Sequence, residues 1–468
     1  MKYSIANIVG LALVVSPIVV SPTIAAAKPA KAVTKASAKH PAKARTKSAA
    51  TPAKAPPRAP DPAFAAAMAK DARGDIAEFY QSRGYRPLWI DSDSGKVGRD
   101  AQSLLRYLDD AQLDGLRSSR YKPEKLRALI AQADSGAPQD LALAELALSQ
   151  AFARYISDVR KIRKNVGYDF ADPDLKPKKQ SAAQILRVAA NSVSFREYMS
   201  DMDWMSPLYA RTRGLLRAAL EQHLPDQMID VIELNRERAR YLPPPTVRHI
   251  LVDAASARLW YFQAGRQAGT MKVVVGAKET QTPLLVGAIN YAILNPYWNI
   301  PDYLVRDNVA KKIVSGRTLD SMHMEVLSDW SANPARLDPA SIDWASVAAG
   351  RGTMPRVREL PGPANSMGKV KFVFPNDEGI YLHDSPNRPL FDKDDRHLSN
   401  GCIRLEKAWV LGEWMMGNTL SARAKKAPTE DAVPLAASVP VYLTYITVVP
   451  TADGVGILPD IYGRDSKR

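Results

Sequence analysis

Apolar residues recur at helical spacing in three stripes between residues 61 and 245. Residues three and four positions apart share one face of a helix, so each stripe predicts a helix packed against a core. Gly84 follows the first stripe and suits a helix C-cap. The stripes are Ile76, Phe79 and Tyr80; Leu104, Leu105, Leu108 and Ala111; and Leu148, Phe152, Tyr155 and Ile156 within 141–156. This half of the chain is therefore expected to be a helical scaffold.

The pattern changes at three consecutive prolines, residues 243–245. Short β-branched and apolar runs follow, bounded by Gly and Pro, and such runs are typical of strands. The strand signal lapses between Pro301 and Gly368, a gap too long for a simple loop, which indicates a lid or a small helical insertion. The predicted strands are 250–252, 259–262, 271–275, 291–294 and 370–374. The expected fold class is α+β, with the helical scaffold followed by a mainly β domain.

The N-terminus has the features of an export signal. Lys2 precedes an apolar stretch at residues 8–20, and the alanines at 25–27 are small enough for a signal peptidase. The alternative is an uncleaved membrane anchor with the same sequence. In both cases the rest of the chain is expected to face an extracytoplasmic space.

Residues 28–60 contain nine Lys and Arg residues and no acid. Such a segment buries too little apolar surface to offset its ordering entropy, which predicts a disordered tether. The formal charge of +15 falls to +5 without these nine residues and Lys2, so the basicity is mostly a property of the tether. Behind an export signal, its expected contact is anionic lipid or wall polymer rather than nucleic acid. A solvated spacer without a partner is the alternative.

The composition excludes several classes of protein. Of the 468 residues, 46% are hydrophobic and 24% are charged, as in an ordinary globular protein. No apolar run reaches the roughly 18–20 residues of a membrane-spanning helix, which excludes a multi-span membrane protein. A single cysteine, Cys402, excludes an internal disulfide and any multi-thiolate metal site. Neither a metal nor a cofactor is expected.

Cys402 lies in a segment that suits a nucleophile. A thiol attacks as its thiolate, and an imidazole within reach, such as that of His383, can take the proton. Gly401 allows a close backbone approach and could leave N–H groups free for an oxyanion hole. Arg404 would favour the thiolate or bind a carboxylate. The alternative is a buried, inert thiol, which is the commoner state of a lone cysteine.

The run from His383 to Arg404 resembles the signature of the YkuD-type L,D-transpeptidases, most closely their large periplasmic YcbB-like branch. The resemblance covers residues from about 70 to 420. Further motifs of that branch are Phe79-Tyr80, Tyr85-Arg86-Pro87-Leu88-Trp89, Gln281-Thr282-Pro283, Asn295-Pro296-Tyr297-Trp298-Asn299-Ile300-Pro301, Ile342-Asp343-Trp344, Gly368-Lys369-Val370-Lys371-Phe372 and Tyr381-Leu382-His383-Asp384.

The resemblance implies a periplasmic enzyme that forms 3–3 cross-links in peptidoglycan. Cys402 would attack a stem tetrapeptide, His383 would serve as the base, and a diaminopimelate amine would accept the acyl group. The backbone near Gly401, with Tyr381, would stabilise the oxyanion. The residues expected to bind substrate are Ser399, Asn400, Asn299 and Trp298.

Two features depart from the family pattern. Asn400 stands where the general family has a His before Gly-Cys, so His383 remains the better base and His397 is the reserve. Many members also carry a peptidoglycan-binding module between scaffold and catalytic domain. Here residues 208–245 can form only two short helices, so that module is expected to be absent.

These features predict five segments. Three alternative functions remain open: an L,D-carboxypeptidase, a thiol endopeptidase of wall peptides, and a non-catalytic wall-binding scaffold. The acceptor could be a stem peptide, a lipoprotein or a free D-amino acid. The segments are a signal peptide (1–27), a basic linker (28–60), the helical scaffold (61–245), the catalytic domain (246–450, with a capping insertion at 302–367) and a C-terminal tail (451–468).

Overall fold

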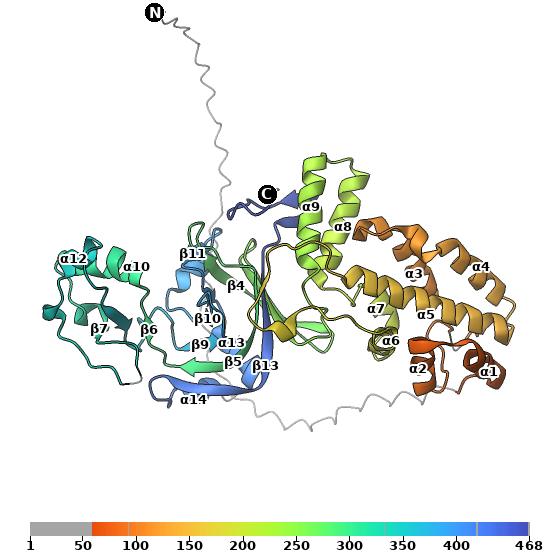
Figure 1. The fold of residues 1–468 in the computed structure, drawn as a ribbon, viewed down its shortest axis with the longest axis horizontal. Coiled ribbons are helices and arrows are strands. Elements are labelled where there is room, and N and C mark those ends of the chain that lie inside the picture. Colours follow the sequence, from red (N-terminus) through yellow and green to blue (C-terminus); the bar gives the residue numbers. More distant parts are fainter. Residues whose placement is uncertain (1–58, 92, 332, 418–419, 467–468) are drawn as a thin grey trace, which may run out of the picture. The chain divides into compact units, whose positions relative to one another are not determined.

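The computed structural model describes residues 59–91, 93–331, 333–417 and 420–466. The predicted signal peptide and all but the end of the basic linker lie outside the described residues. The helical half consists of α1 (Pro62–Asp71), α2 (Gly74–Ser82), α3 (Arg99–Asp109), α4 (Pro123–Ala133), α5 (Pro138–Arg160), α6 (Ala182–Ala190), α7 (Phe195–Ser200), α8 (Pro207–Glu221) and α9 (Asp226–Ala239) (Figure 1). The three stripes fall on α2, α3 and α5, and only Ala111 lies beyond its helix, in a 3₁₀ turn.

A buried carboxylate organises the first helices. The Tyr80 hydroxyl donates to Glu145 of α5 at 2.6 Å, and the main-chain N–H of Trp89 donates to the same carboxylate at 3.1 Å. The Trp89 indole donates to Ser149 at 2.9 Å. Burial raises the pKa of Glu145, and these donors oppose the rise. A buried carboxylate is tolerated when it is hydrogen-bonded, and here the donors are the Tyr80 hydroxyl and the Trp89 N–H.

The second half is built on a sheet that closes on itself. β9 pairs with β10 on one side and with β5 on the other, so the path β5-β13-β2-β3-β4-β12-β10-β9 returns to β5. The short strands β1 and β11 extend this barrel at β5 and β4. The strands are β1 (Asp169–Phe170), β2 (His249–Asp253), β3 (Arg258–Gln263), β4 (Arg266–Gly276), β5 (Leu285–Leu294), β9 (Val370–Val373), β10 (Leu382–His383), β11 (His397–Ser399), β12 (Ile403–Leu405) and β13 (Asp431–Thr444).

Alternation along the strands separates two cores. Ile250 and Val252 point into the barrel core, whereas Leu251 between them joins the core of the helical scaffold. Successive side chains of a strand point to opposite faces, so one strand serves both cores. Gly287 of β5 allows the Phe374 ring to pack closely, since a Cβ atom there would lie 2.5 Å from it.

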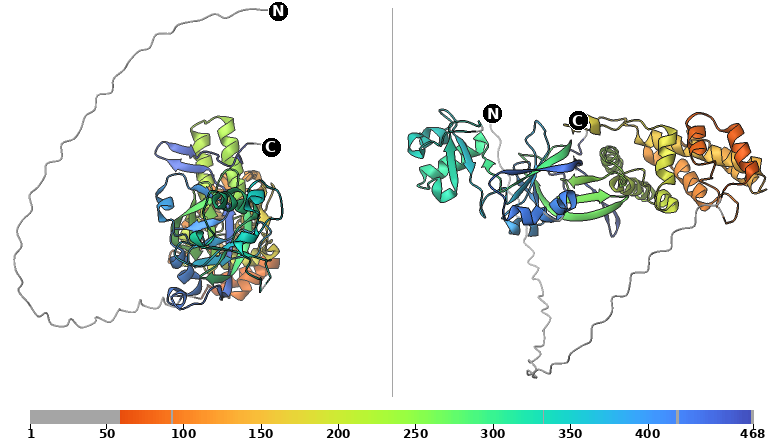
Figure 2. Two further views of the ribbon diagram at one scale, coloured as in Figure 1. Left: turned by 90° about the vertical axis from the view of Figure 1, so that its left-hand side faces the viewer. Right: turned by 90° about the horizontal axis from the view of Figure 1, so that it is seen from below.

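The insertion forms a small subdomain of its own. Its three strands pair in the order β6-β8-β7, and its helices cover a separate apolar core that includes Val326, Trp344 and Val357. It stands as its own group of elements in Figure 2. The elements are β6 (Trp298–Asn299), α10 (Asp302–Leu304), α11 (Lys311–Val314), β7 (Met324–Leu327), α12 (Trp344–Ala348) and β8 (Arg356–Glu359). The sequence indicated a lid or a small helical insertion; the segment contains both helices and a three-stranded sheet that its sequence pattern did not reveal.

Residues 445–466, which include most of the predicted C-terminal tail, pack against the rest of the protein. β14 (Val448–Thr451) and β15 (Gly454–Ile457) form a hairpin. Val448 packs with Leu216 of α8 and Ile232 of α9 in a small core. Residues 458–466 then pack on the barrel, with Tyr462 in its core. Within the described residues, no helix is long and apolar enough to cross a membrane.

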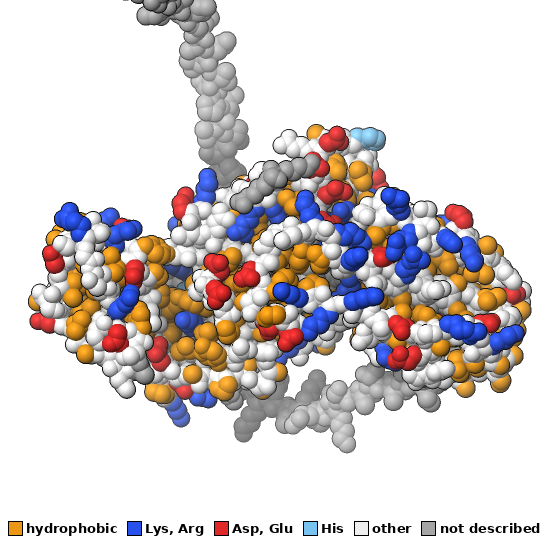
Figure 3. Space-filling model, in the orientation of Figure 1, with side chains coloured by type: hydrophobic (Ala, Val, Ile, Leu, Met, Phe, Trp, Pro, Cys, Tyr) orange, Lys and Arg blue, Asp and Glu red, His pale blue; other side chains and the backbone are white. Residues whose placement is uncertain are grey.

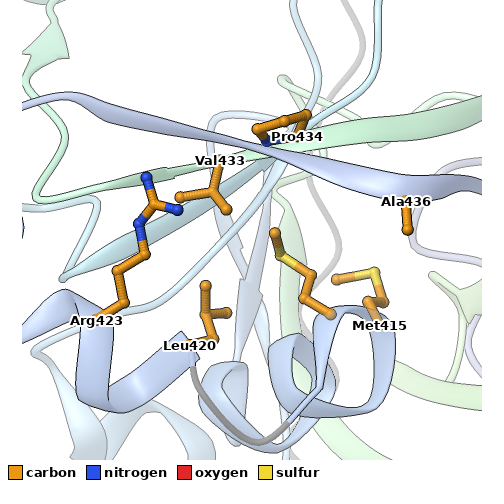
Figure 4. A pocket seen from close by; sticks show the side chains of 7 residues that line it. Met415, Leu420, Arg423, Val433, Pro434 and Ala436 are labelled. Atoms are coloured by element: carbon orange, nitrogen blue, oxygen red, sulfur yellow. The ribbon is translucent and has the colours of Figure 1, made fainter.

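Two helices after β12, α13 (Ala408–Met416) and α14 (Leu420–Ala424), lie against β13. Met415 and Leu420 face Val433 and Pro434 of this strand across a cavity of about 210 Å³ (Figure 4). The cavity contains none of the predicted site residues. On the face drawn in Figure 3, Lys and Arg side chains are mixed with Asp and Glu across the described surface.

Candidate active site

Three neighbouring strands of the barrel bring the candidate residues together. His383 of β10 lies opposite Arg404 of β12 on one side and opposite Lys371 of β9 on the other. Residues directly opposite each other on paired strands point to the same face. The alternate residues Leu382 and Ile403 are fully buried in the barrel core. His383, Arg404 and Lys371 therefore form one row on the outer face of the barrel.

Tyr381 and Cys402 form the next row on the same face. They precede His383 and Arg404 by two positions, which returns a side chain to the same face of a strand. The Ile403 N–H donates to the Tyr381 carbonyl at 3.1 Å, so the two chain segments are already paired here. The 19 residues between His383 and Cys402 thus separate two side chains that the fold makes neighbours.

A tight turn presents Cys402. The Ser399 hydroxyl donates to the Cys402 carbonyl at 2.6 Å and accepts the Gly401 N–H at 3.2 Å. Gly401 has φ of +107°, a conformation that favours glycine. Ser399 is buried, and its hydroxyl serves the turn. The Gly401 N–H is therefore engaged, whereas the Cys402 N–H has no hydrogen-bond partner among the described residues and is the donor left free beside the sulfur.

His383 is held as a neutral imidazole. The ring is 2% exposed, and Nδ1 lies 2.6 Å from the Asp384 carbonyl, which can only accept, so Nδ1 carries the proton. The pKa of His383 is lowered to about 3, chiefly by burial and then by Arg404, although hydrogen bonds with the backbone of Asp384 and Met367 oppose the fall. The other ring nitrogen is then unprotonated, as a base requires. Among the described residues, no hydrogen bond joins this ring to the Cys402 sulfur.

The sulfur lies in a partly buried site with two cations nearby. Burial raises the pKa of the Cys402 thiol, while the N–H and hydroxyl of Tyr381, then Lys371 and Arg404, oppose the rise. The thiol donates weakly to the Gly379 carbonyl at 3.6 Å. The neutral thiol is therefore favoured in the free protein, and the thiolate formed during attack would be stabilised by neighbours already in place.

Lys371 is a site residue to which the sequence analysis gave no role. Its Nζ lies 3.9 Å from the centre of the Tyr381 ring, and burial lowers the pKa of Lys371. Apolar residues flank it in the run from Val370 to Val373, so strand alternation could have placed it on the face of His383. The Arg404 Nε atom is also buried and has no partner among the described residues.

The capping insertion reaches the same face. Burial raises the pKa of Tyr381, the nearby Cys402 adds to the rise, and a hydrogen bond with the Trp298 side chain opposes it. Cys402 also raises the pKa of Tyr303 on α10, after burial. Trp298 therefore lies beside Tyr381, and Tyr303, which the sequence did not single out, lies within electrostatic range of the sulfur.

The remaining predicted residues lie at the edge of this arrangement or outside it. Asn299 and Asn400 are exposed, and their side chains make no hydrogen bond to the described residues. His397, the reserve base, lies on β11. Its ring nitrogens lie 2.7 Å from an Asp395 carboxylate oxygen and 2.8 Å from the Ala254 carbonyl, so the ring is engaged structurally. Among the described residues, no cluster of His, Cys, Asp and Glu could hold a metal ion.

Comparisons with known proteins place this site in a family. Residues 247–433 match the L,D-transpeptidase catalytic domain, YkuD, and residues 74–216 match the Scaffold domain. The chain carries a YkuD-type L,D-transpeptidase catalytic domain after a Scaffold domain. The two domains in this order are the YcbB-like architecture, and the predicted family and fold class are both confirmed.

A curated protein of Haemophilus influenzae, provisionally named L,D-transpeptidase, is 28% identical over 398 residues, which cover 83% of this chain and 78% of that protein. The structure of an L,D-transpeptidase from Mycobacterium smegmatis matches over 42% of this chain and 58% of its own length, at 11% identity and a TM-score of 0.20. The catalytic domain of an Enterococcus faecium L,D-transpeptidase matches over 42% of this chain and 95% of its own length, at 16% identity and a TM-score of 0.18. With TM-scores this low, the family assignment rests on the two sequence domains.

Proposed function

We propose that this L,D-transpeptidase forms 3–3 cross-links in peptidoglycan by acyl transfer through Cys402. The donor is a stem tetrapeptide, and the acceptor is the side-chain amine of diaminopimelate in a second stem. The predicted export signal supports action in the periplasm, with the basic linker as a tether that contacts anionic lipid or wall polymer. The observation that carries the proposal is the unprotonated nitrogen of His383 on the same barrel face as the chain's single thiol.

In the first step, the Cys402 sulfur attacks the carbonyl between the third and fourth residues of the donor. His383 takes the thiol proton, and Lys371 and Arg404 stabilise the negative charge as it develops. The Cys402 N–H and the Tyr381 hydroxyl are the donors available to the oxyanion. His383 then protonates the departing amine, so that the terminal D-Ala leaves and a thioester remains on Cys402.

In the second step, the acceptor amine attacks the thioester carbonyl. His383 accepts a proton from the amine and returns one to the sulfur, which regenerates the thiol and releases the new amide. Water in place of the amine would give a carboxypeptidase instead. Trp298 lies beside Tyr381, and Tyr303 lies within electrostatic range of the sulfur, which supports the insertion as a cover for the donor site; a cover that excludes water favours transfer over hydrolysis.

Muropeptide analysis after incubation with sacculi tests the proposal. The wild-type protein should produce 3–3 cross-linked dimers, and Cys402→Ala should produce none. Tripeptides without dimers would support the carboxypeptidase, and cleaved cross-links would support the endopeptidase. Normal dimer yield from Cys402→Ala would refute the role of the thiol.

A carbapenem provides a second test of the nucleophile. Its strained carbonyl can replace the stem carbonyl, so intact-protein mass spectrometry should show one adduct that maps to Cys402. The chain has no Lys-Thr-Gly triplet, a part of the machinery of serine penicillin-binding enzymes. An adduct that maps to a serine, or that persists in Cys402→Ala, would identify another nucleophile.

A further inference from the structure

The turn that presents Cys402 is held by a neighbouring loop, residues 277–282. The Thr280 hydroxyl donates to the Ser399 carbonyl at 2.9 Å, and the Thr282 hydroxyl donates to the Gly401 carbonyl at 2.7 Å. Thr282 is fully buried. The peptide group whose carbonyl is bound to Thr282 also carries the free Cys402 N–H, so this loop fixes the direction of the oxyanion donor.

The C-terminal segment, residues 458–466, holds this loop in turn. The Tyr462 hydroxyl donates to the Gly276 carbonyl at 2.6 Å, directly before the loop, and lies 3.4 Å from the Thr282 N–H. The Tyr462 ring is 5% exposed and stacks on Tyr445 with a centroid separation of 4.9 Å. Tyr462 therefore connects the barrel core to both ends of the loop.

Arg464 makes a second set of contacts with the same loop. Its Nε donates to the Gln281 side-chain carbonyl at 3.1 Å, and its Nη2 donates to the Thr282 carbonyl at 3.0 Å. The Gln281 amide donates back to the Tyr462 carbonyl at 3.1 Å. The guanidinium also lies 4.8 Å from the centre of the Tyr462 ring. These contacts cross-link the loop and the C-terminal segment through side chains and main chain together.

The C-terminal segment is itself anchored to α9, which packs against α8. Arg238 of α9 forms an ion pair with Asp465 at 2.5 Å, and both side chains are less than 10% exposed. The Thr447 hydroxyl donates to the same carboxylate at 2.5 Å. A buried, fully bonded pair is costly to break, so the segment has one strongly preferred position.

We propose that Tyr462 and Arg464 are positioning residues for acyl transfer, although they lie more than 50 residues beyond Cys402 in the sequence. They fix residues 277–282, which fix the turn at Gly401 and hence the Cys402 N–H. The inference rests on the proposed function, because the group being positioned is the donor to the oxyanion. A displacement of about 1 Å in such a group can cost about 10²-fold in rate.

Tyr462→Phe removes one hydroxyl and leaves the ring stack in place. The matched control is Tyr80→Phe, which removes a hydroxyl that is equally buried, at 2.6 Å from Glu145 in the helical half. Tyr462→Phe should lower kcat for transfer by about 10- to 100-fold with little change in KM. Tyr80→Phe should leave kcat within about twofold, since distant sites act independently. A kcat for Tyr462→Phe equal to that of the control, at equal loss of Tm, would overturn the inference.

Arg464→Gln should reduce kcat in the same way, and Arg464→Lys, which retains a cation and a donor, should recover part of it. Alkylation of Cys402 by iodoacetamide needs no oxyanion donor, so its rate should remain near wild type in Tyr462→Phe, Arg464→Gln and Arg464→Lys. Faster alkylation in step with lost transfer would mean that the turn has simply opened, and would refute positioning. Acylation by a carbapenem reports the same geometry without an acceptor. If the wild-type protein is acylated by the carbapenem but makes no 3–3 cross-links in sacculi, the proposed function is rejected and the positioning inference is not.

Discussion

The buried, neutral state of His383 predicts a specific loss of stability in acid. The pKa is lowered from 6.5 to about 3 in the folded protein. Between these values the unfolded chain binds a proton that the folded protein refuses, so stability falls as pH falls from 6.5 toward 3. At 1.36 kcal/mol per unit, the expected loss at pH 5 relative to pH 7 is about 2 kcal/mol.

His249 provides a matched control. Burial lowers its pKa from 6.5 to about 4, and its Nδ1 lies 2.8 Å from the Val247 carbonyl, away from the cysteine. It too should contribute about 2 kcal/mol of loss at pH 5. Urea unfolding at pH 7 and pH 5 should therefore show that His383→Gln and His249→Gln each reduce the acid-dependent difference by this amount. If the free energy of unfolding of His383→Gln fell between pH 7 and pH 5 by as much as that of the wild type, the pKa argument would be refuted.

Activity separates the two histidines. Because His383 stays unprotonated, the rate of Cys402 acylation should be level from about pH 5 to 8, with no acid limb near 6.5. His383→Ala should lower the transfer rate by about 10²–10⁴-fold, and His249→Gln should not. His397→Ala should cost much less than His383→Ala, because the His397 ring is bonded to Asp395 and Ala254. An acid limb at pH 6.5, or the reverse ranking of these variants, would show that the base is misassigned.

Further predictions concern other parts of the site. Cys402→Ser should keep the fold and lose 3–3 cross-linking, because a hydroxyl is a far weaker nucleophile; wild-type yields of dimers would contradict this. Lys371→Met should raise the pKa of Cys402 further, measured by the pH dependence of alkylation, whereas the exposed Lys369→Met should not; identical profiles would remove Lys371 from the site. Gly401→Ala would place a Cβ atom 3.1 Å from a neighbouring side chain at φ of +107°, and should cost about 1–3 kcal/mol in urea unfolding; unchanged stability would show that the turn relaxes freely. Replacing residues 302–367 with a short Gly-Ser linker should raise the hydrolysed fraction of donor, and unchanged partitioning would mean that the insertion does not cover the thiol.

The sequence predicted those features that depend on local pattern. The stripe ending at Ile156 became α5, and the β-branched run 271–275 became the end of β4. The family motif brought His383 and Cys402 into one hypothesis, and the strand register places His383 opposite Arg404, two residues after Cys402. These signals were readable because helix and strand periodicity is imposed by burial at each position.

Other features depend on contacts that no local pattern records. β13 contains Pro434 and Pro440, which argue against a central strand, yet an irregularity between Pro434 and Val439 accommodates the pairing. The segment after β15 is rich in charged residues, and its position is set by Arg238, 227 residues from Asp465 in the sequence, together with Thr447, just before β14. The acids before His397 in the sequence include one of its partners, Asp395, but the second partner is a carbonyl of the β2–β3 turn, more than 100 residues away. In each case long-range packing overrides local propensity.

The closed strand path of the catalytic domain has a consequence for aggregation. A sheet edge presents unpaired N–H and C=O groups that can recruit a strand from another molecule. Because β9 pairs with both β10 and β5, the described barrel leaves open only the short segments β1 and β11 and the ends of its longer strands. The barrel of a partly unfolded form that keeps this ring intact should therefore resist intermolecular strand pairing, and the step that exposes new strand edges on the barrel is the separation of β9 from β5.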